Sequence, residues 1–295
     1  MKFWKMNGAG NDFIVINNIE AMIPEELLPE IARILCHRHL SIGADGFMAV
    51  AEPTPENREK ADYRMIFLNS DGSMGEMCGN GARCICRYGY ENGLAGEIQR
   101  VETTAGIVIG KRIDERQYRV RLNDPEKIVF DEEITLSGET GEEKHICSYV
   151  ELGNPGIPHC VIEIKNLREY PEDQLRELGR RLRNYQGYPK GANVNFYELT
   201  GVDRLYEKTY ERGVEDFTYA CGTGTGSVVT VLTLQGKVSG QNVKVDMAGG
   251  CLTIDVDCQE GTVKNLYLTG PTNIVAIGDA ADEELKEKLK GKIKI

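Results

Sequence analysis

The sequence carries one short pattern twice, first as Met77-Cys78-Gly79-Asn80-Gly81 and later as Ala220-Cys221-Gly222-Thr223-Gly224. Each cysteine precedes a Gly-x-Gly step and a segment with helical character, which predicts a thiol at the N-terminus of a helix. Unpaired backbone N–H groups there favour negative charge, so we expect a lowered pKa for both thiols. One such cysteine indicates a nucleophile. Two in a repeated pattern indicate a pair of acid–base groups facing each other across a substrate.

The segments around the two cysteines follow the same order. Helices are predicted over residues 25–37, 79–92, 171–184 and 222–235, because apolar residues recur there at helical spacing or follow the cysteine pattern, and a short charged helix is predicted over residues 283–290. Strands are predicted at residues 13–17, 64–68, 98–103, 106–113, 118–122, 160–164, 193–199, 203–211, 216–219, 243–247, 251–256 and 263–269. The repeated order predicts an internal duplication with a cleft between the halves, broken at Asp124-Pro125-Glu126. The alternative is two unrelated α+β domains.

The composition is that of a globular protein of two ordinary domains, with 295 residues, 41% hydrophobic and 27% charged. The chain has no run of about eighteen apolar residues, which argues against a membrane span. Its first residues lack the apolar core of a signal peptide, so we expect a cytoplasmic protein. The 35 Lys and Arg against 46 Asp and Glu give a net charge of −11, which argues against a nucleic-acid partner.

The nine cysteines form neither a disulfide framework nor an obvious zinc site. Their number is odd, no Cys-x-x-Cys pair occurs, and Cys84-x-Cys86 has poor ligand spacing. Cys36-His37-Arg38-His39 is the remaining metal candidate, and we predict no metal. The glycine runs also fail the dinucleotide fingerprint, since Ser227 and Cys84 stand where its last glycine belongs. No lysine is singled out for a pyridoxal Schiff base, so we expect no cofactor.

A pair of matched thiols suits the inversion of a carbon stereocentre. One group removes a proton from one face while the other returns a proton to the opposite face. A thiol suits both tasks because its protonation is easily tuned. The glycines after each cysteine let backbone N–H groups approach a substrate carboxylate and stabilise the charge that develops as the proton leaves.

Further motifs accompany the two cysteine patterns along the chain. They are residues 6–13 (Met-Asn-Gly-Ala-Gly-Asn-Asp-Phe), 43–46 (Gly-Ala-Asp-Gly), 69–73 (Asn-Ser-Asp-Gly-Ser), 78–84 (Cys-Gly-Asn-Gly-Ala-Arg-Cys), 211–213 (Glu-Arg-Gly) and 268–271 (Leu-Thr-Gly-Pro). In this order they resemble the motifs of the diaminopimelate epimerases, the cofactor-independent two-cysteine enzymes of lysine and peptidoglycan biosynthesis. The resemblance covers nearly the whole chain.

The resemblance implies an α/β (α+β) fold of two pseudo-symmetric domains, each a barrel-like mixed sheet around a central helix, with the active site in the cleft between them. It implies that the C-terminus returns to the first lobe. The lobes are then residues 1–122 with 270–295, carrying Cys78, and residues 123–269, carrying Cys221. The implied activity is epimerisation of LL-diaminopimelate to the meso form, and the implied assembly is a homodimer.

The resemblance also implies a set of site residues. Cys78 and Cys221 are the two acid–base groups, and His159 and Glu211 support them. Arg212 is expected to pair with the distal carboxylate of the substrate, which suits a planar, bidentate guanidinium. The other substrate-binding residues that it implies are Asn11, Asn69, Gly79, Asn80, Asn154, Glu211, Asn193, Gly222 and Thr223.

Two departures from the family pattern bear on the choice of substrate. The family usually has Gly-Asn-Pro-His contiguous, whereas three further residues separate Asn154-Pro155 from His159 here. The stretch between Arg212 and Cys221 is one residue longer than the commonest form. The alternative functions are a related racemase of another amino acid, such as histidine, and a non-catalytic ligand- or nucleotide-binding protein.

Overall fold

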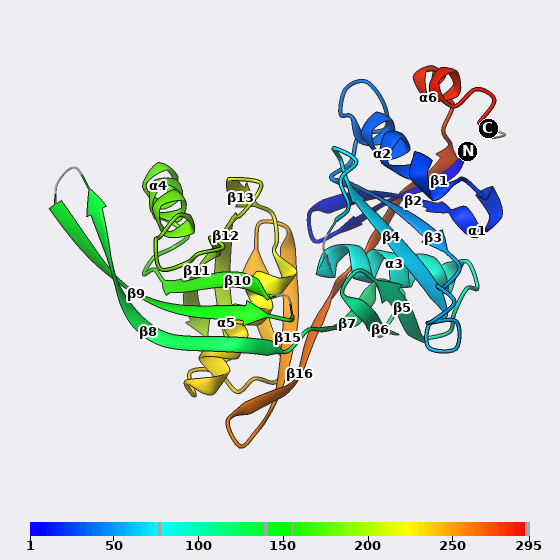
Figure 1. The fold of residues 1–295 in the computed structure, drawn as a ribbon. Helices are drawn as coiled ribbons and strands as arrows, with labels where there is room; N and C mark the ends of the chain where they lie inside the picture. The colour runs from blue at the N-terminus through cyan, green and yellow to red at the C-terminus, as the bar shows by residue number, and fades with distance from the viewer. Residues whose placement is uncertain (76–77, 139–140, 155, 293–295) are drawn as a thin grey trace. The chain divides into compact units, whose positions relative to one another are not determined.

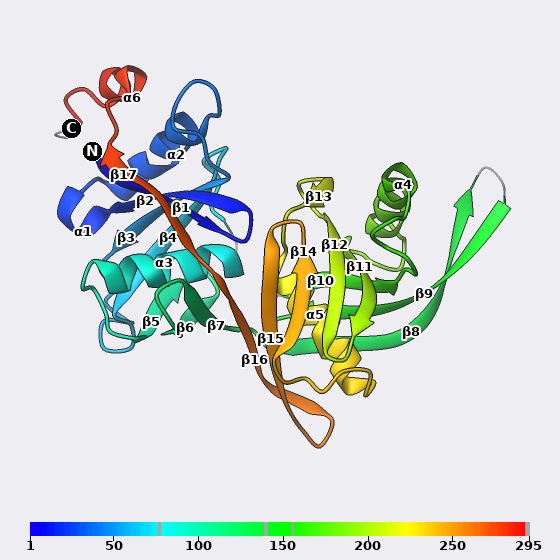
Figure 2. The same cartoon turned by 180° about the vertical axis from the view of Figure 1, so that it is seen from behind.

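The computed structural model describes residues 1–75, 78–138, 141–154 and 156–292. The chain divides into two compact units, one made of Met1–Val120 with Gly270–Ile295 and the other of Arg121–Thr269. Each unit contains one mixed β-sheet and few helices (Figures 1 and 2). Every helix of the described residues is too short or too polar to cross a lipid bilayer.

The first unit is built on eight strands. Its elements are β1 (Lys2–Gly8), β2 (Asn11–Asn17), α1 (Asn18–Ala21), η1 (Glu25–Leu27), α2 (Leu28–Cys36), β3 (Gly46–Ala51), β4 (Tyr63–Asn69), α3 (Gly79–Glu91), β5 (Ile98–Thr103), β6 (Gly106–Arg112), β7 (Gln117–Leu122), β17 (Asn273–Asp279) and α6 (Glu283–Lys288). The strands lie in the order β17–β1–β2–β3–β4–β5–β6–β7, and only β2–β3 and β4–β5 run parallel. The last strand of the chain therefore pairs with the first.

The second unit repeats this plan. Its elements are β8 (Pro125–Gly138), β9 (Gly141–Leu152), β10 (Ile157–Glu163), α4 (Glu172–Arg183), β11 (Asn193–Gly201), β12 (Arg204–Glu211), β13 (Asp216–Thr218), α5 (Gly222–Leu234), β14 (Val243–Met247), β15 (Gly250–Gln259) and β16 (Thr262–Pro271). The order is β8–β9–β10–β11–β12–β14–β15–β16, with only β10–β11 and β12–β14 parallel. The short β13 pairs with the end of β12.

The two strand orders match position by position, including which neighbours run parallel. The helices match as well, since α2 and α4 connect the first parallel pairs, and α3 and α5 connect the second. The predicted fold of two pseudo-symmetric mixed sheets is therefore confirmed by the topology of each unit.

Each sheet curls around one helix and carries another on its opposite face. Helix α3 contacts the neighbouring β1 and β2 and also β6, which is far from them in the strand order, and α5 likewise contacts β8 to β11 and β15. The opposite faces pack on α2 and on α4, where apolar side chains of helix and sheet form two buried clusters. Since α5 is buried on nearly every side, its sequence is apolar all round rather than striped.

Helix α4 shows the contrasting, surface pattern. Leu175, Leu178 and Leu182 are buried on one face, while acidic residues occupy its first turn and arginines its last turn. This charge order complements the helix dipole. The figures show the long β8–β9 hairpin extending past α4 within the second unit.

Some elements were not predicted from the sequence pattern. Strands β1, β3, β8, β9 and β17 are absent from the prediction, and the break expected at residues 124–126 lies at 123–124, between the end of β7 and the start of β8. A bulge between Val129 and Glu132 shifts the register of β8, and Asp131 there has a φ of 48°. The bulge interrupts the alternation by which a strand is recognised.

Candidate functional site

Cys78 is the N-cap residue of α3. Its backbone is extended, with φ −113° and ψ 113°, and its Sγ accepts a hydrogen bond from the backbone N–H of Gly81 at 3.4 Å. The side chain is half-buried. Its sulfur thus satisfies one of the helix's otherwise unpaired N–H groups.

Cys221 occupies the equivalent position on α5. Its φ of −119° and ψ of 104° nearly equal those of Cys78. Its Sγ lies 3.6 Å from the hydroxyl of Thr223, and it forms no capping hydrogen bond to the helix. Both cysteines therefore sit at helix N-termini, as the glycine pattern predicts.

The expected lowering of the thiol pKa does not hold at Cys221. Protein atoms surround its sulfur, and this desolvation raises the pKa well above its usual value. The negative charge of Glu211 raises it further, while the Thr223 hydroxyl and the Gly224 N–H only partly offset both effects. Cys221 is therefore a protonated thiol near neutral pH.

A buried arginine lies beside Cys78 instead. Arg83 is completely buried on α3, and it donates hydrogen bonds to the backbone oxygen of Gly79 at 3.2 Å and to Asn80 Oδ1 at 2.9 Å. Burial lowers the pKa of Arg83 to about 10, so it stays charged at neutral pH. Negative charge on Cys78 favours the charged guanidinium, so a thiolate there and Arg83 stabilise each other.

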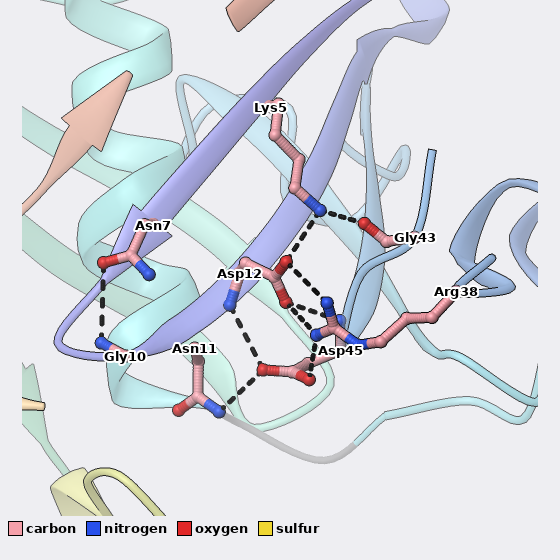
Figure 3. A network of polar contacts seen from close by, with 8 residues as sticks. All are labelled: Lys5, Asn7, Gly10, Asn11, Asp12, Arg38, Gly43 and Asp45. Carbon is pink, nitrogen blue, oxygen red and sulfur yellow. Dashed lines mark hydrogen bonds and ion pairs between the residues drawn. The ribbon is translucent and has the colours of Figure 1, made fainter. Parts of the chain in front are cut away.

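The predicted asparagines of the first unit lie close to this helix end. Asn80 is almost completely buried, and its Nδ2 donates to Asn11 Oδ1 at 2.6 Å. Asn11 Nδ2 in turn donates to Asp45 at 3.2 Å, as Figure 3 shows. Asn69 ends β4, where its exposed side chain donates to Ser73 Oγ at 2.9 Å. The structure thus joins Asn11 and Asn80 by a hydrogen bond, and Asn69 forms its own turn.

Arg212 is positioned by Asn193. Asn193 is buried on β11, where its Nδ2 donates to Pro158 O at 3.1 Å and its Oδ1 accepts the Arg212 N–H at 2.9 Å. The guanidinium of Arg212 donates to Lys190 O at 3.1 Å and forms no ion pair with any carboxylate of the described residues. A guanidinium that contacts a backbone oxygen and no carboxylate keeps its charge available to a carboxylate ligand.

Glu211 and His159 are the two predicted supporting residues. Glu211 ends β12 and accepts a hydrogen bond from Thr218 Oγ1 at 2.9 Å. His159 is completely buried on β10, and burial together with the charge of Arg212 lowers its pKa to about 3. Its Nδ1 faces Asn195 Nδ2 at 3.3 Å, which assigns the proton of the neutral ring to Nε2.

A buried polar cluster extends from His159 beneath α5. Thr209 Oγ1 lies 3.1 Å from Asn195 Oδ1 and 3.2 Å from Glu207 Oε1, and all three residues are buried. Burial raises the pKa of Glu207 to about 8 despite its threonine neighbours. A protonated Glu207 can donate to Thr209, which then donates to Asn195, so the neutral acid completes the cluster.

This cluster requires a glycine at position 224. A side chain added there would meet Asn195 Oδ1 at 2.1 Å and Cys221 Sγ at 3.2 Å. Asn195 and the sulfur thus converge on the same small space at the start of α5. The glycine spacing after Cys221 therefore serves side-chain packing as well as carboxylate access.

The remaining predicted residues have simpler surroundings. Gly79 and Gly222 are the buried first residues of α3 and α5, Thr223 is half-buried, and Asn154 is exposed in the turn before β10. No group of three metal-ligating side chains lies together in the part of the chain that the structure describes.

Sequence reasoning did not find Asp45, Arg83, Asn195, Glu207 or Thr209. The sequence does contain a signal for Glu207 and Thr209. Alternation along β12 from buried Leu205 places positions 207 and 209 on the inner face, where polar residues are unusual.

Comparison with known proteins points to one family. A sequence model of the family described as diaminopimelate epimerase matches residues 3–128 and 152–275. The diaminopimelate epimerase of Aquifex aeolicus is 38% identical over 97% of this chain and 100% of its own length, and that of Archaeoglobus fulgidus is 37% identical over 96% and 98%.

The chain belongs to the diaminopimelate epimerase family. The two ranges that match the family contain Cys78 and Cys221, one in each, together with every predicted site residue. The expected family membership is therefore confirmed.

Solved structures share the fold at low sequence identity. A probable proline racemase from Agrobacterium radiobacter aligns with a TM-score of 0.66 and 16% identity, covering 95% of this chain and 92% of that one. A phenazine biosynthesis protein of the PhzF family from Enterococcus faecalis aligns at 0.65 and 13% identity, covering 95% and 99%. The two-unit fold of this family member is thus shared with proteins of divergent sequence.

Proposed function

We propose that this protein converts LL-diaminopimelate to the meso form by inverting one α-carbon without pyridoxal phosphate. The observation that carries the proposal is the equivalent placement of Cys78 and Cys221, each at the N-cap position of the enclosed helix of one topological repeat. Membership of the diaminopimelate epimerase family supports the choice of substrate.

The chemistry needs one thiolate and one thiol. The thiolate removes the α-proton, the electron pair stays on the carbon as a carbanion, and the thiol returns a proton to the opposite face. Each turnover therefore exchanges the charge state of the two sulfurs, and the reverse reaction restores it. The charged Arg83 beside Cys78 and the raised pKa of Cys221 support Cys78 as the resting thiolate.

The carboxylate at the reacting centre fits the helix N-termini. Gly79 and Asn80 begin α3, and Gly222 and Thr223 begin α5, and backbone N–H groups at the start of a helix favour an anion. Such donors stabilise the charge that spreads onto the carboxylate as the proton leaves.

The far end of the substrate is assigned to Arg212. Asn193 holds the backbone N–H of Arg212, and the guanidinium donates to Lys190 O and pairs with no carboxylate of the described residues. Diaminopimelate carries a second carboxylate, which a planar guanidinium binds through two parallel hydrogen bonds.

The test is proton exchange in deuterium oxide. The wild-type protein should incorporate deuterium at one α-carbon of LL-diaminopimelate and form the meso product. Cys78→Ala and Cys221→Ala should each reduce turnover by about a thousandfold, the scale of general acid–base catalysis. Tight binding of diaminopimelate with no exchange, unchanged in both variants, would instead favour a non-catalytic binding protein.

A racemase of another amino acid, such as histidine, is the second candidate. The observation that favours it is the three further residues between Asn154-Pro155 and His159, of which Ile157 and Pro158 belong to β10 and pair with β9. A panel of L-amino acids assayed for racemisation decides between the two. Turnover of histidine but not of diaminopimelate would reject our preferred substrate.

Two finer features of the proposal rest on the family resemblance and the composition. We expect a cytoplasmic homodimer that binds neither nucleic acid nor membrane. Light scattering of the purified protein measures the assembly, and cell fractionation measures the location.

A further inference from the structure

A line of hydrogen bonds in the first unit runs from a guanidinium to a carboxylate through two amides. Arg83 Nη2 donates to Asn80 Oδ1 at 2.9 Å, Asn80 Nδ2 donates to Asn11 Oδ1 at 2.6 Å, and Asn11 Nδ2 donates to Asp45 Oδ2 at 3.2 Å. We call these four residues the amide relay. They come from three separate segments of the chain, so the fold itself brings them together.

The ends of the amide relay determine its direction. A guanidinium has only hydrogen-bond donors, and a carboxylate has only acceptors. An amide has both, so its neighbours decide which way its oxygen and its NH₂ group point. If Asn80 were reversed, its NH₂ group would face the NH₂ of Arg83. If Asn11 were reversed, its oxygen would face the carboxylate of Asp45. Each reversal sets like groups against each other, so only one orientation satisfies both amides.

Both ends are firmly held. Arg83 is completely buried and is tied to Gly79 O. Asp45 accepts the backbone N–H of Asp12 at 3.2 Å and an Arg38 N–H at 2.8 Å, as Figure 3 shows. The acceptor end is therefore fixed by neighbours that take no part in the relay itself.

Asp12 completes the support. It contacts Lys5 at 2.7 Å and Arg38 at 2.6 Å, and it accepts the Asp45 N–H at 2.9 Å. Burial alone would raise the pKa of Asp12, but its hydrogen bonds from Arg38 and Lys5 outweigh burial and hold that pKa below its usual value. Asp12 thus stays ionised and keeps Arg38 on Asp45.

We propose that Arg83 and Asp45 are positioning residues that fix the orientation of the Asn80 and Asn11 amides for substrate binding. The inference rests on the proposed function, together with the expectation that both asparagines contact the amino-acid substrate. With the observed orientation, Asn11 Nδ2 carries its second N–H on the side of the amide that faces Asp45. A reversed amide would place an oxygen there, which would exchange a hydrogen-bond donor for an acceptor at the substrate.

The test is a double-mutant cycle on KM with Arg83→Met and Asp45→Asn. Each change removes one defining end, and we expect each to raise KM about tenfold, the cost of one hydrogen bond to a charged group. Arg83 and Asp45 act on the same amides, so the double variant should bind hardly worse than either single variant. Arg83→Met should also lower kcat, because it removes the charge beside Cys78.

The matched control is Arg87→Met on the same helix. Arg87 donates to Thr272 O at 2.8 Å and takes no part in the amide relay. Its effect on KM should be small and should add to that of Asp45→Asn. Thermal melts establish that the variants fold, and Arg83→Lys, which keeps the charge but loses the fork of donors, replaces Arg83→Met if the latter does not.

The outcomes separate the two levels of inference. Wild-type protein without amino-acid epimerase activity would reject the proposed function. Active wild-type protein with purely additive KM effects for Arg83→Met and Asp45→Asn would reject the amide relay alone. Non-additive KM effects of Arg83→Met and Asp45→Asn, with additive effects of Arg87→Met and Asp45→Asn, support the amide relay.

Discussion

The cysteines at the N-termini of α3 and α5 have nearly the same backbone conformation, but the charged side chains near them are of opposite sign. Cys78 and Cys221 differ by less than ten degrees in both φ and ψ. A buried guanidinium lies behind the first, while Glu211 and buried Glu207 both raise the pKa of the second. The duplicated fold thus supplies two equivalent positions, and the charged side chains around them differ in sign.

The glycines three residues after each cysteine provide the sharpest test of this difference. Gly224→Ala forces a side chain against Asn195 and the Cys221 sulfur, whereas Gly81→Ala meets only ordinary contacts of 3.5 Å or more. We expect Gly224→Ala to cost about 1–3 kcal/mol of stability from overpacking. It should also lose about a hundredfold in turnover through displacement of the sulfur.

Gly81→Ala is the control for that change. Removing a glycine from a helix should leave the free energy of unfolding unchanged or raise it by up to about 1 kcal/mol. Urea unfolding and deuterium exchange measure both variants. Equal losses at the two positions would mean that the helix starts are packed alike.

The second test concerns the buried acid beneath α5. The pKa of Glu207 is about 8 in the folded protein, above the ordinary 4.5, so between these values the folded state holds a proton that the unfolded chain has released. Stability should therefore fall as the pH rises through this window, by up to about 1.4 kcal/mol per pH unit. Glu207→Gln cannot ionise and should remove this slope.

Thermal or urea unfolding at pH 6 and pH 8 measures the effect. We expect the glutamine variant to gain roughly 2 kcal/mol over the wild type between these pH values. The Glu163→Gln variant, which changes a glutamate that is exposed on β10, should show no such gain. An unchanged slope in Glu207→Gln would show that Glu207 is ionised at pH 6.

Local sequence patterns predict the repeated architecture but not the charges around it. The Cys-Gly-x-Gly pattern places both helix starts correctly, because capping and glycine spacing are local properties. Strand β3, in contrast, is buried at every position and shows no alternation. Strand β8 was not predicted because its bulge interrupts the alternation of residues along the strand.

The electrostatic partners could not be predicted because they depend on contacts between distant segments. Arg83 looks like one residue of a motif, and only the structure shows it buried against Asn80. Asp45 meets Asn11 across 34 positions of sequence. The alternation of β12 does point inward at Glu207, but it does not reveal that Thr209 and Asn195 lie beside it.

The third test removes the positive charge of the first helix start. Arg83→Met should disfavour the Cys78 thiolate and move its alkylation by iodoacetamide about one unit toward higher pH, the low end of the shift from one nearby charge. Peptide mass spectrometry resolves Cys78 from the other eight cysteines. Arg87→Met on the same helix should leave the alkylation of Cys78 where it is.

The smallest effect is expected when the negative charge near Cys221 is removed. The resulting shift in alkylation is opposite in direction to the shift expected for Cys78 in Arg83→Met. Glu211→Gln removes a charge that raises the pKa of Cys221, so alkylation of that thiol should move toward lower pH. Desolvation is the larger cause and persists in the variant. Glu211 is also only half-buried, so water screens its charge, and we expect the alkylation of Cys221 to shift by about half a pH unit.

Shifts of the same sign in Arg83→Met and Glu211→Gln would refute the idea that the charges near the two cysteines are opposite in sign. A full return of Cys221 to ordinary thiol reactivity would show that the carboxylate, and not the packing of protein around the sulfur, keeps it protonated.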